Sequence, residues 1–383
     1  MKKNNIIALF LAFISLPGFS FEVDLLEKGK FSCDNDISYD SKGEIISCEA
    51  SGVVCHSGMI YFVTDWWKNS KPNFFFYKSN GHSNISKIAK EIEQETINST
   101  KKIEDLTLSQ NGEYVFATSS FFFGPLWDAV WKPMNRILYW PTTNPSLVRI
   151  LDFEDTPNEE LMRSKILDSV RVRYPDTDFI KIESLAVLPN NRLLMAVRER
   201  GTKYDQFEYQ SILISISYEV AKNGNLHLVG EFEVIAEMDL SHPLLEGTYS
   251  LSSFEYDFDY HVLYALATYE RGDPSNPFST ALWCLYSNDN FVSEQGYTAE
   301  LAKDCSGSPL LLPHKLEGIS KIKGLRYIAV ADDDRIFTTS DGTRKPYEAF
   351  YYIFNLNLRS SASRVSLKID RFWYILRTHK IRT

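Results

Sequence analysis

The sequence has little helical pattern and no apolar run long enough to cross a membrane. Only residues 86–97 and 158–170 look helical, and both stand between segments of β character. The apolar run at residues 6–16 is far shorter than the roughly 20 residues that a membrane-spanning helix needs. We therefore expect an all-β fold with no membrane span.

Several signatures of chemistry are also missing. No Cys-x-x-Cys or Cys/His spacing occurs, which argues against a zinc site. No Gly-x-Ser-x-Gly occurs, so serine hydrolysis has little support. Basic residues are in deficit, with 41 Lys and Arg against 50 Asp and Glu and a formal net charge of −9. A chain this acidic is a poor partner for nucleic acid or an anionic membrane.

The N-terminal residues have the pattern of a signal peptide. Lys2 and Lys3 precede the apolar run, and small residues precede Phe21, so we expect cleavage before Phe21. Removing the two lysines takes the net charge from −9 to −11. The expected organisation is a signal peptide at 1–20 and one domain at 21–383, in a secreted or periplasmic protein.

The five cysteines fall into two clusters. Export to an oxidising compartment permits disulfides, and we expect one within each cluster. We expect Cys284 to pair with Cys305. In the first cluster Cys33 has two alternatives, Cys48 and Cys55, and either choice leaves one thiol over.

A short pattern recurs along the chain: an acid begins an apolar strand, a tight connection follows, and a second strand ends in polar residues. The clear copies contain Glu104, Glu183 and Glu317. Two further copies align by their strand ends, and there Ser51 and Ser252 take the place of the glutamate. Internal repeats of this kind indicate a repeat architecture.

Each copy continues with further short β-branched and aromatic runs bounded by turn residues, which are typical of strands. Repeated sets of about four short strands indicate a β-propeller. Five copies predict a five-bladed propeller, closed by an N-terminal strand that joins the last blade. The alternative is six blades, with residues 21–46 and the C-terminal strands forming a blade of their own.

Propeller topology predicts where the repeated residues lie. Because the second strand runs antiparallel to the innermost one, the start of the first strand and the end of the second share one face. The expected ring around the axis consists of Ser51, Glu104, Glu183, Ser252 and Glu317. Around it lie the residues that end the second strands, Asp65, Ser119, Arg198, Arg200, Glu270 and Asp332. Four connections expected on the same face, residues 120–135, 199–210, 269–280 and 333–349, are long.

Three glutamates that converge in a narrow channel must retain protons or share a cation, because burial and like charge both oppose their ionisation. Carboxylate and hydroxyl oxygens without sulfur or imidazole suit a hard ion, and Ca²⁺ tolerates such a ring better than Mg²⁺ does. The alternative is that these polar residues only cap strands or bind water in the channel.

The order Ser, Glu, Glu, Ser, Glu resembles the axial calcium site of the calcium-activated nucleotidases, the five-bladed apyrases. The resemblance covers the inner strands and includes Ser51-Gly52-Val53, Glu183-Ser184 and Glu317-Gly318-Ile319. A weaker resemblance is to phytase-type, esterase-like propellers. By this resemblance the five ring residues bind calcium, and Arg198 and Arg200 contact the phosphates of a nucleoside di- or triphosphate.

The predicted function is then a calcium-dependent phosphohydrolase of nucleotides or a related small phosphoester or anhydride. Arg198, Arg200 and Glu270 are the candidate substrate-binding residues, and Asp65, before Asp332, is the candidate general base. A non-catalytic binding module that uses the same propeller mouth to hold a ligand or protein partner is the alternative. Arg198 and Arg200 can also simply pair with the neighbouring acids Glu199, Asp205 or Glu208 on a solvated face.

Overall fold

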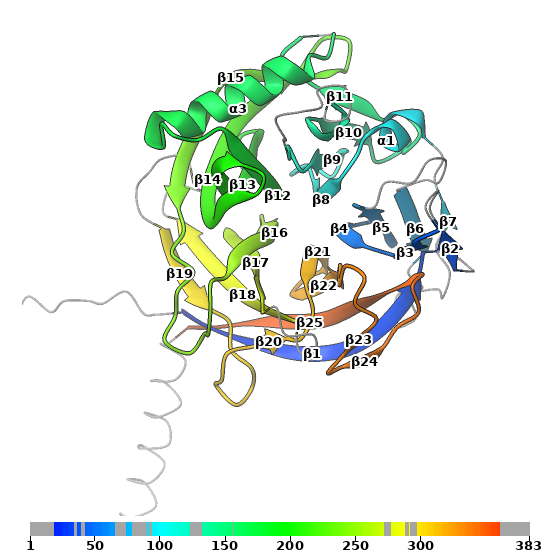
Figure 1. Ribbon diagram of the computed structural model, residues 1–383, viewed down its shortest axis with the longest axis vertical. Helices are drawn as coiled ribbons and strands as arrows, with labels where there is room; N and C mark the ends of the chain where they lie inside the picture. Colours follow the sequence, from blue (N-terminus) through cyan, green and yellow to red (C-terminus); the bar gives the residue numbers. More distant parts are fainter. Residues whose placement is uncertain are drawn as a thin grey trace, which may run out of the picture.

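The structure is a computed structural model that describes residues 19–33, 37–39, 43–65, 74–78, 90–91, 94–122, 132–154, 156–271, 277–287, 291 and 297–360. Its main feature is a circle of antiparallel sheets around a common axis (Figure 1). The predicted all-β, propeller-like arrangement is confirmed. Residues 1–18 of the proposed signal peptide, the last of the expected short strands (residues 364–369) and most of the helix expected at 86–97 lie outside the described residues, although α1 (Glu95–Ser99) covers the end of that helix.

Among the described residues, four of the sheets around the axis have four strands and a further one has five. The strands nearest the axis are β4 (Ala50–His56), β8 (Ile103–Leu108), β12 (Phe179–Leu188), β16 (Ser250–Asp257) and β21 (Leu316–Lys323). Next to them lie β5 (Met59–Thr64), β9 (Tyr114–Ser119), β13 (Arg192–Lys203), β17 (Val262–Glu270) and β22 (Arg326–Ala331). The third strands are β6 (Phe74–Lys78), β10 (Ile137–Pro141), β14 (Gln206–Val220), β18 (Phe278–Ser287) and β25 (Glu348–Ser360).

The outermost strands are β7 (Lys90–Glu91), β11 (Arg149–Leu151), β15 (Leu226–Glu237), β19 (Tyr297–Leu301) and β1 (Phe19–Ser32). The last of these closes the circle, because β1 pairs with β25 over its whole length. The expected closure by an N-terminal strand is therefore confirmed. The short strand β20 (Leu311–Leu312) adds to β18.

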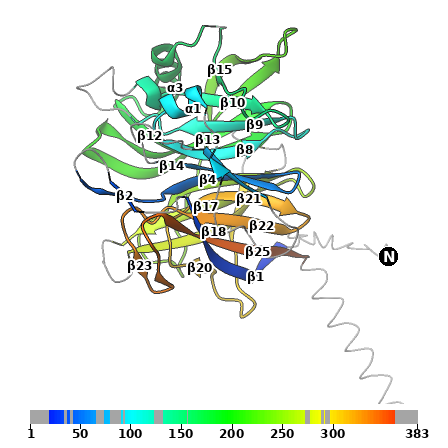
Figure 2. The same cartoon turned by 90° about the vertical axis from the view of Figure 1, so that its right-hand side faces the viewer.

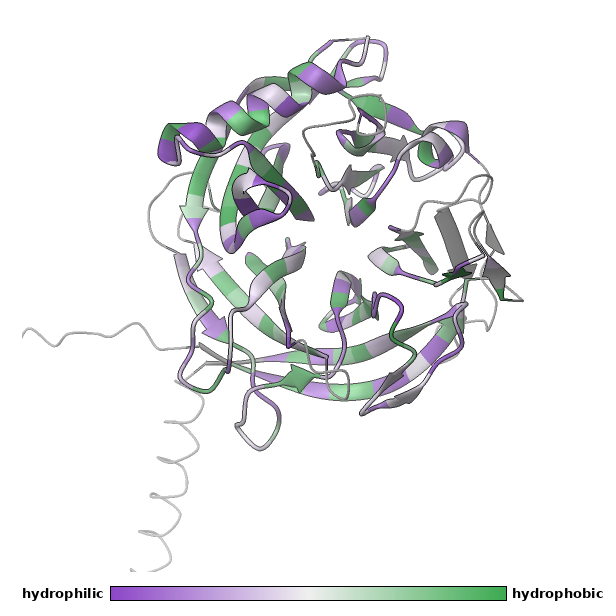
Figure 3. Ribbon diagram, viewed as in Figure 1, coloured by the Kyte–Doolittle hydropathy of each residue, from purple (hydrophilic) through white to green (hydrophobic). Residues whose placement is uncertain are grey.

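Apolar residues fill the spaces between neighbouring sheets rather than one central core. The part of the chain that the structure describes contains five clusters of buried side chains. Each is shared by two adjacent sheets, as with Leu194 and Trp283 between the β12 and β16 sheets. Figure 3 shows hydrophobic positions alternating with hydrophilic ones along these strands. Interdigitation of β-branched and aromatic side chains across the faces of packed sheets holds such a circle together.

The helix expected at 158–170 is confirmed as α3 (Glu159–Arg173), which lies outside β15 (Figure 1). The side chain of Asn158 caps it by accepting a hydrogen bond from the Leu161 N–H, and two acids open its first turn. None of the helices in the described part of the chain has the length and apolarity to cross a membrane.

Two expectations about the long connections are corrected. Residues 199–210 are not a loop, because β13 continues to Lys203 and β14 resumes at Gln206 as a projecting hairpin. Residues 333–349 contain a small hairpin, β23 (Thr338–Thr339) and β24 (Gly342–Thr343), which lies on the same side of the molecule as β2 (Ser38–Tyr39) in Figure 2.

Among the cysteines, Cys33 is bonded to Cys48, one of the two predicted alternatives, and Cys55 carries the leftover thiol. The expected Cys284–Cys305 bond is wrong. Cys284 is buried in the middle of β18, whereas Cys305 lies in an exposed turn beyond β19. Strand geometry holds the two thiols in different environments, and proximity in sequence does not bring them together.

Candidate functional site

The five residues predicted to ring the axis share one backbone feature. In each inner strand the pairing with the second strand shifts register at that residue, so that it has no partner opposite it. The shifts fall at Ser51, Glu104, Glu183, Ser252 and Glu317. A β-bulge of this kind turns a side chain out of the normal alternation and is frequent beside functional sites. All five of these side chains are buried.

Small residues next to the bulges let the inner strands approach one another. A Cβ on Gly52 would lie 2.8 Å from the Leu106 nitrogen in β8, and a Cβ on Gly318 would lie 2.9 Å from the Val53 nitrogen in β4. Both positions therefore require glycine for close backbone contact between neighbouring sheets. This tight packing narrows the channel and brings the ring side chains together.

The structure brings the three glutamates of the ring into one cluster. One carboxylate oxygen each of Glu104, Glu183 and Glu317 lies within 4.8 Å of the other two. Oε1 of Glu104 and Oε2 of Glu317 are buried and have no hydrogen-bond partner. The two serines are engaged with backbone carbonyls, since Ser252 Oγ donates to Leu316 O at 2.7 Å and Ser51 Oγ to Glu49 O at 3.4 Å.

A second acid cluster lies beside the first and contains a residue that sequence reasoning missed. One oxygen each of Glu49, Asp65 and Asp332 lies within 4.8 Å of the other two. Asp65 and Asp332 were predicted to lie around the ring, whereas Glu49 was not singled out. The sequence does contain a signal for Glu49, because it stands two residues before Ser51, a position that is also charged in the three glutamate repeats.

The same position two residues upstream holds a lysine in the three glutamate repeats. Lys181 forms an ion pair with Glu183, and Lys315 lies 2.8 Å from Glu317 Oε1 and 3.8 Å from Asp332 Oδ2. Lys102 pairs with Asp65 at 2.9 Å and lies 3.8 Å from Glu104. The recurring Lys-x-Glu pattern was visible in the sequence. It places Lys102 and Lys315 between the two acid clusters, whereas Lys181 contacts Glu183 and Glu199.

Arg198 is the fourth cation of the site. It is only 1% exposed, because its own bulge in β13 turns it inward. Its guanidinium donates to Glu183 Oε2 at 3.1 Å, to Glu317 Oε1 at 3.4 Å and to Glu270 Oε1 at 2.7 Å. The predicted substrate-binding residues Arg198 and Glu270 therefore bind each other. Arg200 faces elsewhere, where it pairs with Asp176 and Glu208.

Neighbouring charges and burial shift the pKa values of the three clustered glutamates in different directions. Burial alone would raise the pKa of Glu183, but Lys181 and Arg198 hold that pKa below its usual range. Burial and the charge of Glu183 raise the pKa of Glu104 well above its usual range. Burial also raises the pKa of Glu317, and Glu183 and Asp332 add to this effect. The surroundings therefore favour the ionised form of Glu183 and oppose ionisation of Glu104 and Glu317.

The second cluster divides in the same way. Burial and the neighbouring Asp65 raise the pKa of Glu49 to about 10, and burial raises the pKa of Asp332 well above its usual range. Asp65 is desolvated too, yet Lys102 keeps the pKa of its carboxyl below the usual value. The two clusters hold six acids, and four cations of the described residues form ion pairs with them. The site therefore has an excess of carboxyl groups that protons or a bound cation must neutralise.

Comparison with known proteins gives a fold likeness only. No family model matches the sequence, and no curated protein matches it. Similar solved structures include a PQQ-bound aldose sugar dehydrogenase from Streptomyces coelicolor, at 10% identity and TM-score 0.39, with 89% of this chain and 100% of that one covered. A Penicillium chrysogenum α-L-arabinanase complexed with arabinobiose is similar at 10% identity and TM-score 0.41, with 86% of this chain and 98% of that one covered. A Pseudomonas aeruginosa periplasmic gluconolactonase is similar at 10% identity and TM-score 0.34, with 83% of this chain and 93% of that one covered.

The family resemblance drawn from the inner strands is corrected by these comparisons. Neither a family model nor a curated relative supports the calcium-activated nucleotidases, and the similar structures named above are a dehydrogenase, an arabinanase and a lactonase. At such identities and TM-scores, none of these proteins carries its own activity over to this chain.

Proposed function

We propose that this chain is an exported, cation-binding β-propeller in which each of the five sheets counts as a blade and a calcium ion is bound on the axis. The supporting observation is the bulge that recurs at every ring residue and turns three glutamate oxygens to within 4.8 Å of one another. An all-oxygen donor set with buried carboxylate oxygens that accept no hydrogen bond has the chemistry of a hard-cation site.

Glu104, Glu183 and Glu317 are the proposed carboxylate ligands, and Ser51 and Ser252 are the proposed hydroxyl ligands. Both hydroxyls donate to backbone carbonyls, which leaves their lone pairs directed away from those carbonyls. Arg198 fixes the orientation of two of the glutamates. A bound calcium ion would neutralise the excess of carboxylates and polarise an oxygen of a ligand.

A calcium-dependent phosphohydrolase acting on nucleotides or a related phosphoester is the more detailed prediction, and a non-catalytic binding module is its alternative. Hydrolysis has one supporting observation, the juxtaposition of carboxyl groups with opposite pKa shifts, which is the arrangement that acid–base catalysis uses. Asp65, held ionised by Lys102, is better suited to be a base than Asp332. Binding without catalysis is favoured by Arg198 and Arg200, whose guanidinium groups are already paired with carboxylates.

Export is supported by the Cys33–Cys48 disulfide, since such bonds persist in oxidising compartments.

The cation proposal is tested by calcium titration of the chelator-treated protein, with calorimetry and thermal unfolding as the two readouts. We expect saturable binding and an increased melting temperature, because a ligand that binds only the folded state at about 100 times its Kd adds about 2.7 kcal/mol of stability. Glu183→Gln should abolish this response. The matched control is Glu255→Gln, a glutamate of β16 outside both acid clusters.

An unchanged melting temperature with calcium and with chelator would remove the cation proposal. Phosphate release from ATP, ADP, UDP and phytate, with calcium and with chelator, separates the enzyme from the binding module. If micromolar protein releases no phosphate from any of these substrates, the phosphohydrolase is excluded and the binding module is the remaining alternative.

A further inference from the structure

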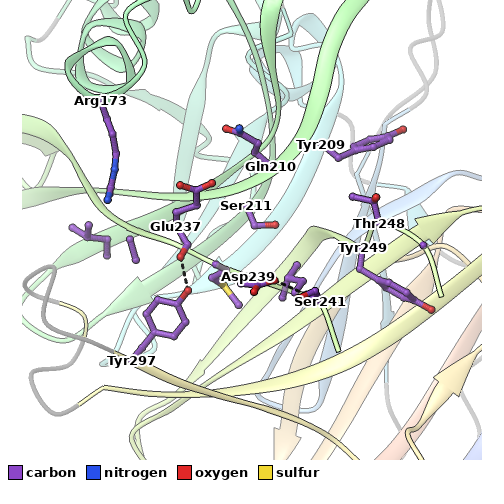
Figure 4. A pocket seen from close by; sticks show the side chains of 15 residues that line it. Arg173, Tyr209, Gln210, Ser211, Glu237, Asp239, Ser241, Thr248, Tyr249 and Tyr297 are labelled. Atoms are coloured by element: carbon purple, nitrogen blue, oxygen red, sulfur yellow. Dashed lines mark hydrogen bonds between the residues drawn. The ribbon is translucent and has the colours of Figure 1, made fainter. Parts of the chain in front are cut away.

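A cleft of about 730 Å³ opens between the β12 and β16 sheets (Figure 4), and none of the six acids of the two clusters lines it. One wall comes from the start of β14 and the end of β15, and the other from the chain that leads into β16. Its volume falls within the range of about 300–1,000 Å³ that is usual for small-molecule sites. The residues that line it include Tyr209, Gln210, Ser211, Glu237, Thr248 and Tyr297.

The walls offer hydrogen bonds and tyrosine rings without a surplus of positive charge. Hydroxyl and amide groups come from Gln210, Ser211 and Thr248. Arg173 is the cation of the lining, and two acids, Glu237 and Asp239, accompany it. A phosphate or carboxylate ligand would need a surplus of cations, so this lining favours a neutral ligand rich in hydroxyl groups.

Aromatic rings continue from the cleft along the projecting hairpin of β13 and β14. Tyr209 is 36% exposed at the edge of the cleft, and its ring lies 5.6 Å from that of Phe207. Phe207 packs on Phe179, and Phe122 links Phe179 to Tyr204 at the tip. Tyr204 and Phe207 are also exposed, at 51% and 38%. The Phe179 ring in this row is buried, whereas those of Tyr204, Phe207 and Tyr209 are exposed. Exposed rings gathered on one hairpin mark a binding surface, and this surface extends beyond the cleft itself.

The hairpin is held in place by the groups beneath it. The Arg198 guanidinium lies 5.6 Å from the centre of the Tyr209 ring, and Arg200 donates to Gln210 Oε1 at 2.8 Å. Gln210 in turn donates to Glu208 Oε1 at 2.9 Å. The ring and the amide therefore sit on a fixed support, which is the preorganisation that a specific site needs.

We propose that this cleft and the aromatic row bind a neutral oligosaccharide. The apolar C–H face of a sugar ring packs on tyrosine and phenylalanine faces, while its hydroxyls bond the polar side chains of the cleft. A chain of sugar residues, rather than a monosaccharide, matches a site that continues from a cleft onto an exposed row. This inference is independent of the proposed axial cation.

The test is calorimetric titration of the full chain with neutral oligosaccharides of hexoses and of pentoses, in chelator and in calcium. A sulfated oligosaccharide and a nucleoside diphosphate serve as charged comparisons. We expect binding of at least one neutral oligosaccharide that persists in chelator, which separates this proposal from the cation proposal. Tyr209→Ala should weaken the affinity at least tenfold, whereas Tyr209→Phe should retain most of it, because the ring makes the contact.

Thr248→Trp fills the cleft from the opposite wall and should also weaken binding at least tenfold. Tyr260→Ala is the control, because this exposed tyrosine lies in the turn between β16 and β17. No binding of any neutral oligosaccharide at millimolar concentration would overturn the proposal. So would tighter binding of a charged comparison, or equal affinity of the wild type, Tyr209→Ala and Thr248→Trp.

Discussion

Asp105 ties together inner strands from different sheets, and its replacement by asparagine tests how the axis is held. The residue is fully buried in β8, next to the ring residue Glu104. Its Oδ1 accepts from the Leu106 N–H at 2.9 Å, and its Oδ2 accepts from the Leu185 N–H of β12 at 2.9 Å. Ser253 of β16 lies 3.0 Å from Oδ2, and Ser253 Oγ also accepts from the Ile319 N–H of β21.

The Asp105→Asn variant keeps the shape of the side chain but replaces an acceptor with a donor. Whichever way the amide is placed, its NH₂ group faces a backbone N–H, either that of Leu106 or that of Leu185. A buried donor left without a partner costs about 1–3 kcal/mol, and here both the amide NH₂ and the backbone N–H that it faces lack an acceptor. We expect the free energy of unfolding to fall by about 2–4 kcal/mol.

The assay is chemical denaturation followed by tyrosine and tryptophan fluorescence, in which the midpoint moves while the slope stays constant. Asp168→Asn makes the same chemical change on the exposed side of α3, where the side chain of Asp168 is 65% exposed, and should cost under about 0.5 kcal/mol. If Asp105→Asn costs no more than Asp168→Asn, the carboxylate does not carry these backbone bonds, and the account of the axis is wrong.

Three further predictions follow from individual sites. Burial raises the pKa of Glu255 to about 8, so the folded protein keeps a proton that the unfolded chain loses near pH 4.5. The free energy of unfolding therefore falls as the pH rises from 4.5 to about 8. Glu255→Gln should therefore match the wild type at pH 4.5 and exceed it by about 1–3 kcal/mol at pH 8.5; equal pH profiles in denaturation would refute this. Replacing Cys33 by serine opens a loop with a sequence separation of 15 and should cost about 3 kcal/mol in oxidising buffer but nothing in reductant. Gly318→Ala places a Cβ 2.9 Å from the Val53 nitrogen and should lower the midpoint of denaturation by an amount equivalent to about 1–3 kcal/mol; an unchanged midpoint would show that β21 can move away from β4.

The strand pattern and the repeat could be predicted from the sequence because both are local properties. Alternation of apolar and polar residues over five or six positions identifies a strand wherever it packs. Repeated copies also placed Glu104, Glu183 and Glu317 at equivalent positions, and equivalent positions in a closed circle of sheets meet at its axis. The repeated sets of four strands also led to the prediction that an N-terminal strand completes the last sheet, as β1 does beside β25.

Other features depended on contacts between segments distant in sequence. The Lys-x-Glu pattern was visible, but the pairing of Lys102 with Asp65 across two sheets was not. Sequence spacing favoured Cys284 and Cys305, whereas the geometry of β18 and of the exposed turn keeps them apart. Residues 199–210 have the polar character of a loop and still continue as a hairpin, because backbone hydrogen bonds between β13 and β14 extend past the sheet.

The sequence by itself determined that this chain forms repeated sheets with acids at their inner ends. Only the tertiary structure decided what those acids face. The bulges turn them inward, and Arg198, drawn into the axis by its own bulge, binds carboxylates that a phosphate ligand would have to displace. The physical reason is that propensity and periodicity act along the strand, whereas charge pairing in a buried channel depends on which strands meet across the axis.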